Sequence, residues 1–147
     1  MSEPLSSGQC DAIGDLPLPV DYSRVRLYRS GSRGLARATR GLVLWLSRGR
    51  AVALGNHVFL PRRCDADLAV LAHELTHCAQ YQAWGWWRYF GRGAAAQLRH
   101  LRHRVLGIGE SPYAYRLESD KPFEAYGMEQ QGQIVEDLVR RRHPPLT

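Results

Sequence analysis

The stretch between Asp65 and Gly85 constrains the fold more than any other part of this sequence. Residues 66–84 contain neither proline nor glycine. Aspartate is a residue type that caps the N-termini of helices, and glycine is one that commonly ends them. The pattern therefore predicts a helix over residues 66–84.

The segments before this helix predict short strands. Val25–Tyr28 begins with the alternation of apolar and polar residues that is typical of a strand. Two apolar runs separated by Gly55-Asn56 predict a β-hairpin that ends before Pro61, because glycine suits the first position of a tight hairpin turn. A single strand with a bulge at Gly55 is the alternative.

Three further helices complete the predicted elements. Apolar residues recur at helical spacing over residues 35–46, and a second helix is expected over residues 94–105. The last helix is expected from about Asp120 to Arg140, with Pro122 in its first turn. The sequence thus predicts an α+β fold, in which short strands and a hairpin pack on the central helix and a C-terminal helix lies beside it.

The length of the chain fits one domain. Its 147 residues leave little room for a second core, so we predict a single domain over residues 21–147. Residues 1–20 are rich in Ser, Gly and Pro and are expected to form a flexible lead. Three cysteines without a CxxC pair favour a reducing compartment. We recognise no signal peptide or membrane-spanning stretch, so we expect a soluble, cytoplasmic protein without membrane contact.

The chain is basic, with 20 Lys and Arg residues against 14 Asp and Glu residues. Such a balance attracts nucleic acid, anionic lipid and acidic substrates without specificity. The arginines are spread along the chain and do not form one stripe, which favours a solvated surface over a specific nucleic-acid site. Composition leaves the oligomeric state open.

His73, Glu74 and His77 form an HExxH motif inside the predicted central helix. Histidines four residues apart lie on one face of a helix, one turn apart, where both imidazoles can bind the same ion. Zinc accepts imidazole nitrogen and carboxylate oxygen, and three protein ligands leave one position for water. Glu74 can then take a proton from that water as a general base. The motif predicts one Zn²⁺ ion and a catalytic glutamate; the alternative is a chance grouping of hydrogen-bonded histidines.

The third zinc ligand is expected to be a carboxylate. No later histidine completes the HExxHxxGxxH pattern, because the residues after His77 do not fit it. Glu124 is the preferred candidate, since it lies early in a predicted helix beside Ala125, whose small side chain allows close approach. Glu118 and Glu129 are the alternatives.

Together these features resemble the gluzincin metallopeptidases, and in particular the compact bacterial domains called minigluzincins. The likeness covers about residues 25–135. It consists of the HExxH motif followed by Gln80, the hairpin before the motif, a loop with Tyr113 and Tyr115, and the segment Pro122–Ala125. It implies a hydrolase that cleaves peptide bonds in a peptide or protein substrate, with His73, His77 and Glu124 as zinc ligands and Glu74 as the general base.

One position departs from the pattern of the thermolysin-type enzymes. These carry an acidic residue four positions after the ligand glutamate, where this chain has Met128. Hydrogen bonds that orient the histidines must therefore come from other residues.

The resemblance also suggests substrate contacts. Peptidases of this kind bind substrate as an added strand along a sheet edge, and residues 57–60 are the predicted edge, with His57 and Phe59 as candidate contacts. Tyr113, Tyr115 and Tyr126 are candidates for the group that hydrogen-bonds the oxyanion. Buried tyrosines more often serve packing.

Two other functions remain open on the sequence alone. One is a catalytically weak, zinc-bearing interaction module associated with a larger machinery, because compact domains that resemble this chain are often attached to secretion or toxin-related machinery. The other is a SprT-like DNA-associated protease, which the arginine content suggests. The intact Glu74 favours an enzyme, since a purely structural zinc site needs no base.

Overall fold

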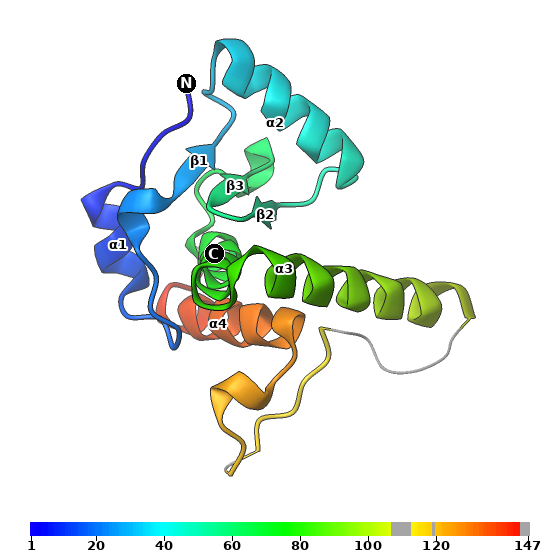
Figure 1. Cartoon of the computed structure of the whole chain (residues 1–147). Helices are drawn as coiled ribbons and strands as arrows, with labels where there is room; N and C mark the ends of the chain where they lie inside the picture. The colour runs from blue at the N-terminus through cyan, green and yellow to red at the C-terminus, as the bar shows by residue number, and fades with distance from the viewer. Residues whose placement is uncertain (107–112, 119, 145–147) are drawn as a thin grey trace.

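The computed structural model of the chain describes residues 1–106, 113–118 and 120–144 (Figure 1). Within these residues the fold is α+β, as predicted, with four α-helices and one three-stranded sheet. No helix of the described part is both long and apolar enough to cross a membrane. The elements are α1 (Ser7–Ile13), β1 (Arg26–Tyr28), α2 (Gly34–Leu46), β2 (Val52–Leu54), β3 (His57–Phe59), α3 (Leu68–Leu106) and α4 (Met128–Arg142), with short 3-10 helices at Tyr22–Arg24, Arg62–Cys64 and Phe123–Ala125.

The sheet confirms the predicted first strand and hairpin. β3 lies in the centre, parallel to β1 and antiparallel to β2. Gly55 begins the turn of the hairpin with a φ of 64°, a left-handed conformation that glycine adopts without strain. Because β3 is central, His57–Phe59 is not the sheet edge that we expected; the edges are β1 and β2.

Helix α3 begins at Leu68, slightly later than predicted. Its N-cap is Asp67, whose Oδ1 accepts hydrogen bonds of 3.0 Å from the backbone N–H groups of Ala69 and Val70. Asp65, the predicted cap, instead accepts a hydrogen bond from Ser30. Two aspartates precede the helix, and residue type alone does not distinguish them.

Gly85 divides α3 into two parts. Its φ of 76° and ψ of 170° lie outside the helical region, so the first part ends where the sequence predicts. The second part follows at once, although we expected it only from Ala94. In Figure 1 the first part lies against α4, and the second part projects away from the body of the protein.

The first twenty residues carry more structure than the flexible lead that we predicted. Ser6 and Gln9 form a capping box that starts α1. Ile13 at the end of this helix is fully buried, and the backbone of Glu3 pairs with that of Leu27 in β1. A helix this short has little periodicity, which is why composition suggested a loop.

Helix α4 begins at Met128 and not near Asp120 as predicted. Gly127 is its N-cap, and the backbone N–H of Gly127 donates to the side chain of Gln130 at 2.9 Å. Pro122 lies ahead of a 3-10 turn, outside the helix. Proline suits a turn as well as the first turn of a helix, so it does not fix the boundary.

The core lies between the sheet and helices α1, α3 and α4. Its largest fully buried apolar side chains come from all of these regions: Ile13, Val25, Leu27, Val58, Leu60, Leu71, Leu75 and Val135. Helix α2 lies on the other side of the sheet, and none of its residues is buried (Figure 1). The fold therefore places the histidine-bearing part of α3 between the sheet and α4.

Candidate metal centre

His73 and His77 project from one face of α3, as their spacing predicts. Their rings are 5.0 Å apart between centroids, and the two residues are 8% and 6% exposed. Their Nε2 atoms face helix α4, where a carboxylate completes the cluster.

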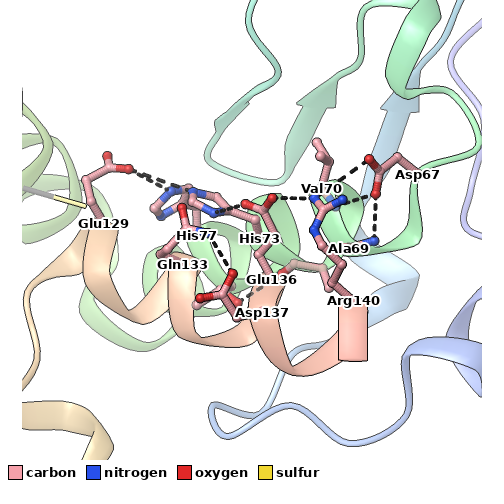
Figure 2. Close-up of polar contacts among 12 residues, drawn as sticks. Asp67, Ala69, Val70, His73, His77, Glu129, Gln133, Glu136, Asp137 and Arg140 are labelled. Atoms are coloured by element: carbon pink, nitrogen blue, oxygen red, sulfur yellow. Dashed lines mark hydrogen bonds and ion pairs between the residues drawn. The ribbon is translucent and has the colours of Figure 1, made fainter. Parts of the chain in front are cut away.

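That carboxylate belongs to Glu129. Its Oε2 lies 3.8 Å from Nε2 of His73 and 3.6 Å from Nε2 of His77 (Figure 2). Two ligand atoms of a tetrahedral zinc ion stand roughly 3.3 Å apart, given metal–ligand bonds of about 2.0 Å. One ligand atom from each residue lies within 4.8 Å of the other two. Small movements of the side chains would bring all three onto one ion.

The structure does not bring Glu124 to the histidines. Glu124 is exposed in the 3-10 turn ahead of α4, and Glu118 is exposed beside Lys121. We preferred Glu124 because we placed the start of the last helix near Asp120. Since α4 begins later, Glu129 lies in its first turn and takes the position next to α3.

Glu136 of α4 holds the second ring nitrogen of His73. Nδ1 of His73 lies 3.1 Å from Oε2 of Glu136. Arg140 donates to the other oxygen of this carboxylate at 2.6 Å and lies 3.9 Å from Asp67 at the start of α3 (Figure 2). A carboxylate at Nδ1 places the ring proton there and leaves Nε2 free to bind a metal.

Gln80 holds the second ring nitrogen of His77 in the same way. Oε1 of Gln80 lies 2.8 Å from Nδ1 of His77, and its amide donates to Oε1 of Gln131 at 2.9 Å and to the carbonyl of Met128 at 3.0 Å. A carbonyl only accepts, so these contacts fix the orientation of the Gln80 amide and make Nδ1 of His77 the donor. Nε2 of His77, which faces Glu129, is thus the nitrogen left to bind a metal.

Gly132 allows α4 to approach His73 this closely. A Cβ at this position would lie 2.8 Å from Nε2 and 2.9 Å from Cε1 of the imidazole. Glu129, Gly132 and Glu136 are three and then four residues apart, so they share one face of α4. Gly132 lies against the imidazole of His73, and the carboxylates of Glu129 and Glu136 contact the two nitrogens of that ring.

Without a metal, the cluster is a buried network of charges. Burial opposes a charged His73, but the carboxylates of Glu129 and Glu136 beside its two ring nitrogens outweigh it and raise the His73 pKa to about 10. Burial also opposes the Glu129 carboxylate, yet the neighbouring imidazoles of His73 and His77 lower its pKa. The hydrogen bond with His73 is the main reason that the Glu136 pKa is lowered. Two anions beside two imidazoles suit a divalent cation.

Glu74 lies beside this cluster without belonging to it. Burial raises the pKa of its carboxyl, against the opposing effect of His77 and His73. The carboxyl accepts a hydrogen bond from the backbone N–H of Ala53 in β2. The carbonyl of Ala53 accepts another from the Tyr89 hydroxyl at 2.9 Å. The backbone N–H and C=O of Ala53 are thus both hydrogen-bonded to α3. An added strand could therefore not hydrogen-bond this residue of the edge strand β2.

A cavity of about 890 Å³ opens over the cluster. Its floor includes the two histidines, Glu74 and Glu129, and its walls come from the end of α2, from β2 and from the second part of α3. Tyr113 is the one predicted substrate contact that lines it among the described residues. Burial raises the pKa of the Tyr113 hydroxyl, which keeps it protonated at neutral pH.

The other predicted substrate contacts lie elsewhere. His57 is exposed on β3, with Nδ1 3.2 Å from the hydroxyl of Tyr28, and Phe59 is buried and stacked on the ring of Tyr28. Tyr115 donates to a carboxylate of α4, and the buried hydroxyl of Tyr126 bonds the backbone of the preceding loop. None of these four residues lines the cavity over the histidines.

Three residues of the site were given no role in our prediction from the sequence. Gln80 follows His77 by three residues and so shares its helix face, a signal that could have identified it. Gly132 and Glu136 stand at helical spacing from Glu129. This spacing identifies Gly132 and Glu136 as site residues only once Glu129 is known to face the histidines.

Two comparisons relate the chain to secretion machinery. The eCIS core domain family matches residues 18–85, which include the sheet, α2 and both histidines. Over 150 aligned residues the chain is 28% identical to the type VI secretion system spike protein VgrG2b of Pseudomonas aeruginosa. The alignment covers 95% of this chain and 13% of that protein. No solved structure matches the chain.

These matches correct the family and the function that we expected. The resemblance to gluzincin metallopeptidases was wrong, because the matching family is the eCIS core domain and the similar protein is a secretion spike. The same matches contradict the expected peptide-bond hydrolase and favour the interaction module. The HExxH motif misled because its spacing specifies how two histidines meet a metal, not which reaction follows. The chain is similar to part of a component of a secretion machinery.

Proposed function

We propose that this chain is an interaction module of a secretion or contractile injection machinery and that it carries one zinc ion. The main support is the extent of the similarity, since 95% of the chain aligns with only 13% of a large spike protein. A chain that corresponds to one small part of a machine component is suited to attach to its other parts. The eCIS core match over residues 18–85 supports the same kind of machinery.

The zinc is proposed from the chemistry of the cluster. Two imidazole nitrogens and one carboxylate oxygen come from buried residues, and Glu136 and Gln80 orient both rings for coordination through Nε2. This donor set is one that zinc prefers. A bound ion would link α3 to α4, because its ligands come from both helices. Three protein ligands leave one coordination position for water or for a donor atom of a partner.

Metal analysis of the purified full chain tests the zinc. We expect about one zinc per chain for the wild type and for Glu124→Gln, whose carboxylate lies away from the cluster. A variant that combines His73→Ala with His77→Ala should lose the metal. A wild type without zinc, or a double variant that keeps it, would contradict the proposed site.

Attachment to a machinery is tested by sedimenting secretion particles from cells that produce the chain. We expect the wild type and Glu74→Gln to sediment with the particles equally, because attachment needs no general base. A chain that remains in the supernatant would contradict the module. Cleavage of unfolded casein by the wild type and not by Glu74→Gln would replace the module with a catalytic function.

A further inference from the structure

Helix α2 exposes several of its large apolar side chains, of which Leu46 also lines the cavity over the histidines. The exposed fractions are 83% for Leu35, 58% for Leu42, 75% for Trp45 and 66% for Leu46. The helix lies at the periphery, on the far side of the sheet from α4 (Figure 1), and its end forms part of the wall of the cavity. Several large apolar side chains exposed on one helix mark an interaction surface.

The spacing of these residues is that of a seam between two helices. Leu35, Ala38, Leu42 and Trp45 follow one another at intervals of three, four and three residues, as do the a and d positions of a heptad. The opposite side of α2 faces the protein, where Arg40 donates to the carbonyl of Leu60 at 2.8 Å. A stripe of this kind can pack against one helix of a partner.

The charge around this seam favours an acidic partner. No aspartate or glutamate stands between Asp21 and Asp65. Within the described part of the chain, none of the arginines of this segment forms an ion pair. Exposed arginines lie at both ends of α2 and along it, at Arg33, Arg37 and Arg48.

We infer that the outer face of α2 docks an amphipathic helix of a partner protein, whose apolar stripe is flanked by acidic side chains. Carboxylates beside the partner's stripe would be attracted to the arginines that lie along α2 and at its ends. A second copy of this chain fits poorly, because its own α2 would bring the same positive charges to the contact. We rely on the proposed function only for the existence of a protein partner, since Leu35, Leu42 and Trp45 lie outside the cavity over the histidines.

Two synthetic peptides of about three heptads test this docking with the full chain. One has leucine at the a and d positions and glutamate at the flanking e and g positions; the other has lysine in place of the glutamates. Like charges at e and g keep each peptide from pairing with itself. In fluorescence anisotropy we expect the acidic peptide to bind, the basic one not to bind, and added salt to weaken the binding.

Matched variants locate the binding surface. Leu42→Gln combined with Trp45→Gln should weaken binding of the acidic peptide by roughly tenfold or more, because these side chains lie at the centre of the seam. Glutamine is a good helix former, so α2 should persist, as circular dichroism can verify. The control is Trp87→Gln on α3, whose indole is 81% exposed and lies outside the seam. We expect it to bind the peptide as the wild type does.

Several outcomes would overturn the inference. They are equal binding of the two peptides, no binding of either, or binding that the α2 variant leaves unchanged. Binding to phosphatidylglycerol vesicles through α2 without binding to the acidic peptide would assign the face to a lipid surface. Self-association that the α2 variant abolishes would assign it to a second copy.

A zinc-site variant separates this inference from the proposed function. The chain with His73→Ala and His77→Ala should lose zinc and still bind the acidic peptide, because the seam lies on another element. If the chain binds the peptide but does not sediment with secretion particles, only the proposed attachment to a machinery is contradicted. If the chain sediments with the particles but does not bind the peptide, only the docking of an acidic helix on α2 is contradicted.

Discussion

Gly132 of α4 lies directly against the imidazole of His73, so that an added Cβ would stand 2.8 Å from Nε2. The ring cannot move aside without losing a contact, because Glu136 holds Nδ1 at 3.1 Å and Glu129 lies 3.8 Å from Nε2. Helix packing and the geometry of the candidate metal site therefore depend on the same residue. A single methyl group at Gly132 tests both.

We expect Gly132→Ala to weaken zinc binding and to lower the stability of the protein. The new methyl group would push His73 or α4 away, which should lower zinc affinity by about 10- to 100-fold, as loss of ligand orientation does. Overpacking of this kind destabilises by about 1–3 kcal/mol. Zinc titration and urea unfolding measure the two effects.

The control is Gly41→Ala in α2, where a Cβ would meet no heavy atom within 4 Å. Alanine favours a helix over glycine by up to about 1 kcal/mol, so this variant should be at least as stable as the wild type. If Gly132→Ala bound zinc as the wild type does, the close packing of α4 on His73 would not matter for the site.

Glu129→Gln should weaken zinc binding more than any change at Glu124. The amide keeps the size of the side chain and removes the negative charge that a zinc ligand supplies. We expect affinity to fall by at least about 100-fold, the upper end of what loss of an outer hydrogen bond causes. Calorimetric titration compares it with Glu124→Gln, which should bind as the wild type does. A greater loss at Glu124 would reverse this assignment.

Local patterns predicted the parts of the fold that local chemistry determines. The helix around His73 and His77 ends at Gly85 because glycine adopts positive φ there, and the hairpin turns at Gly55 for the same reason. The spacing of the two histidines places their rings together whatever packs around them. These features need no knowledge of distant residues.

The third carboxylate depends on where two distant helices meet, and the sequence predicts this poorly. Acidic residues at 118, 124 and 129 all precede or begin the last helix. The boundary is fixed by the cap at Gly127 and Gln130, which is a weaker signal than Pro122. Likewise, the period of α2 shows that one face is apolar, yet it cannot show that this face points outward.

Gln80→Leu should destabilise the protein and weaken zinc binding. It would leave Nδ1 of His77 and the buried oxygen of Gln131 without their hydrogen bonds to the Gln80 amide. An unpaired buried polar group costs about 1–3 kcal/mol, which urea unfolding can measure. Gln80→Glu is the matched variant, because it keeps an acceptor for His77. Its zinc affinity should lie closer to the wild type, and equal loss in both variants would show that Gln80 does not act through His77.

In the metal-free protein, stability should fall as the pH rises from about neutral towards 10. The His73 pKa is raised from 6.5 to about 10, so its contribution is fully present below 6.5 and is lost as the pH rises through 10. Glu129 and Glu136 have pKa values lowered from 4.5, so their contribution is present above 4.5 and is lost as the pH falls. Maximum stability of the cluster is therefore expected between about pH 4.5 and pH 6.5.

Zinc should reverse the alkaline part of this trend, because coordination requires the neutral imidazole that forms as the pH rises. Urea midpoints measured with a chelator should be lower at about pH 8.5 than at about pH 5.5, while the gain from added zinc should be larger at the higher pH. The double variant with His73→Ala and His77→Ala should show neither effect. A zinc gain independent of pH would mean that the ion binds outside the histidine cluster.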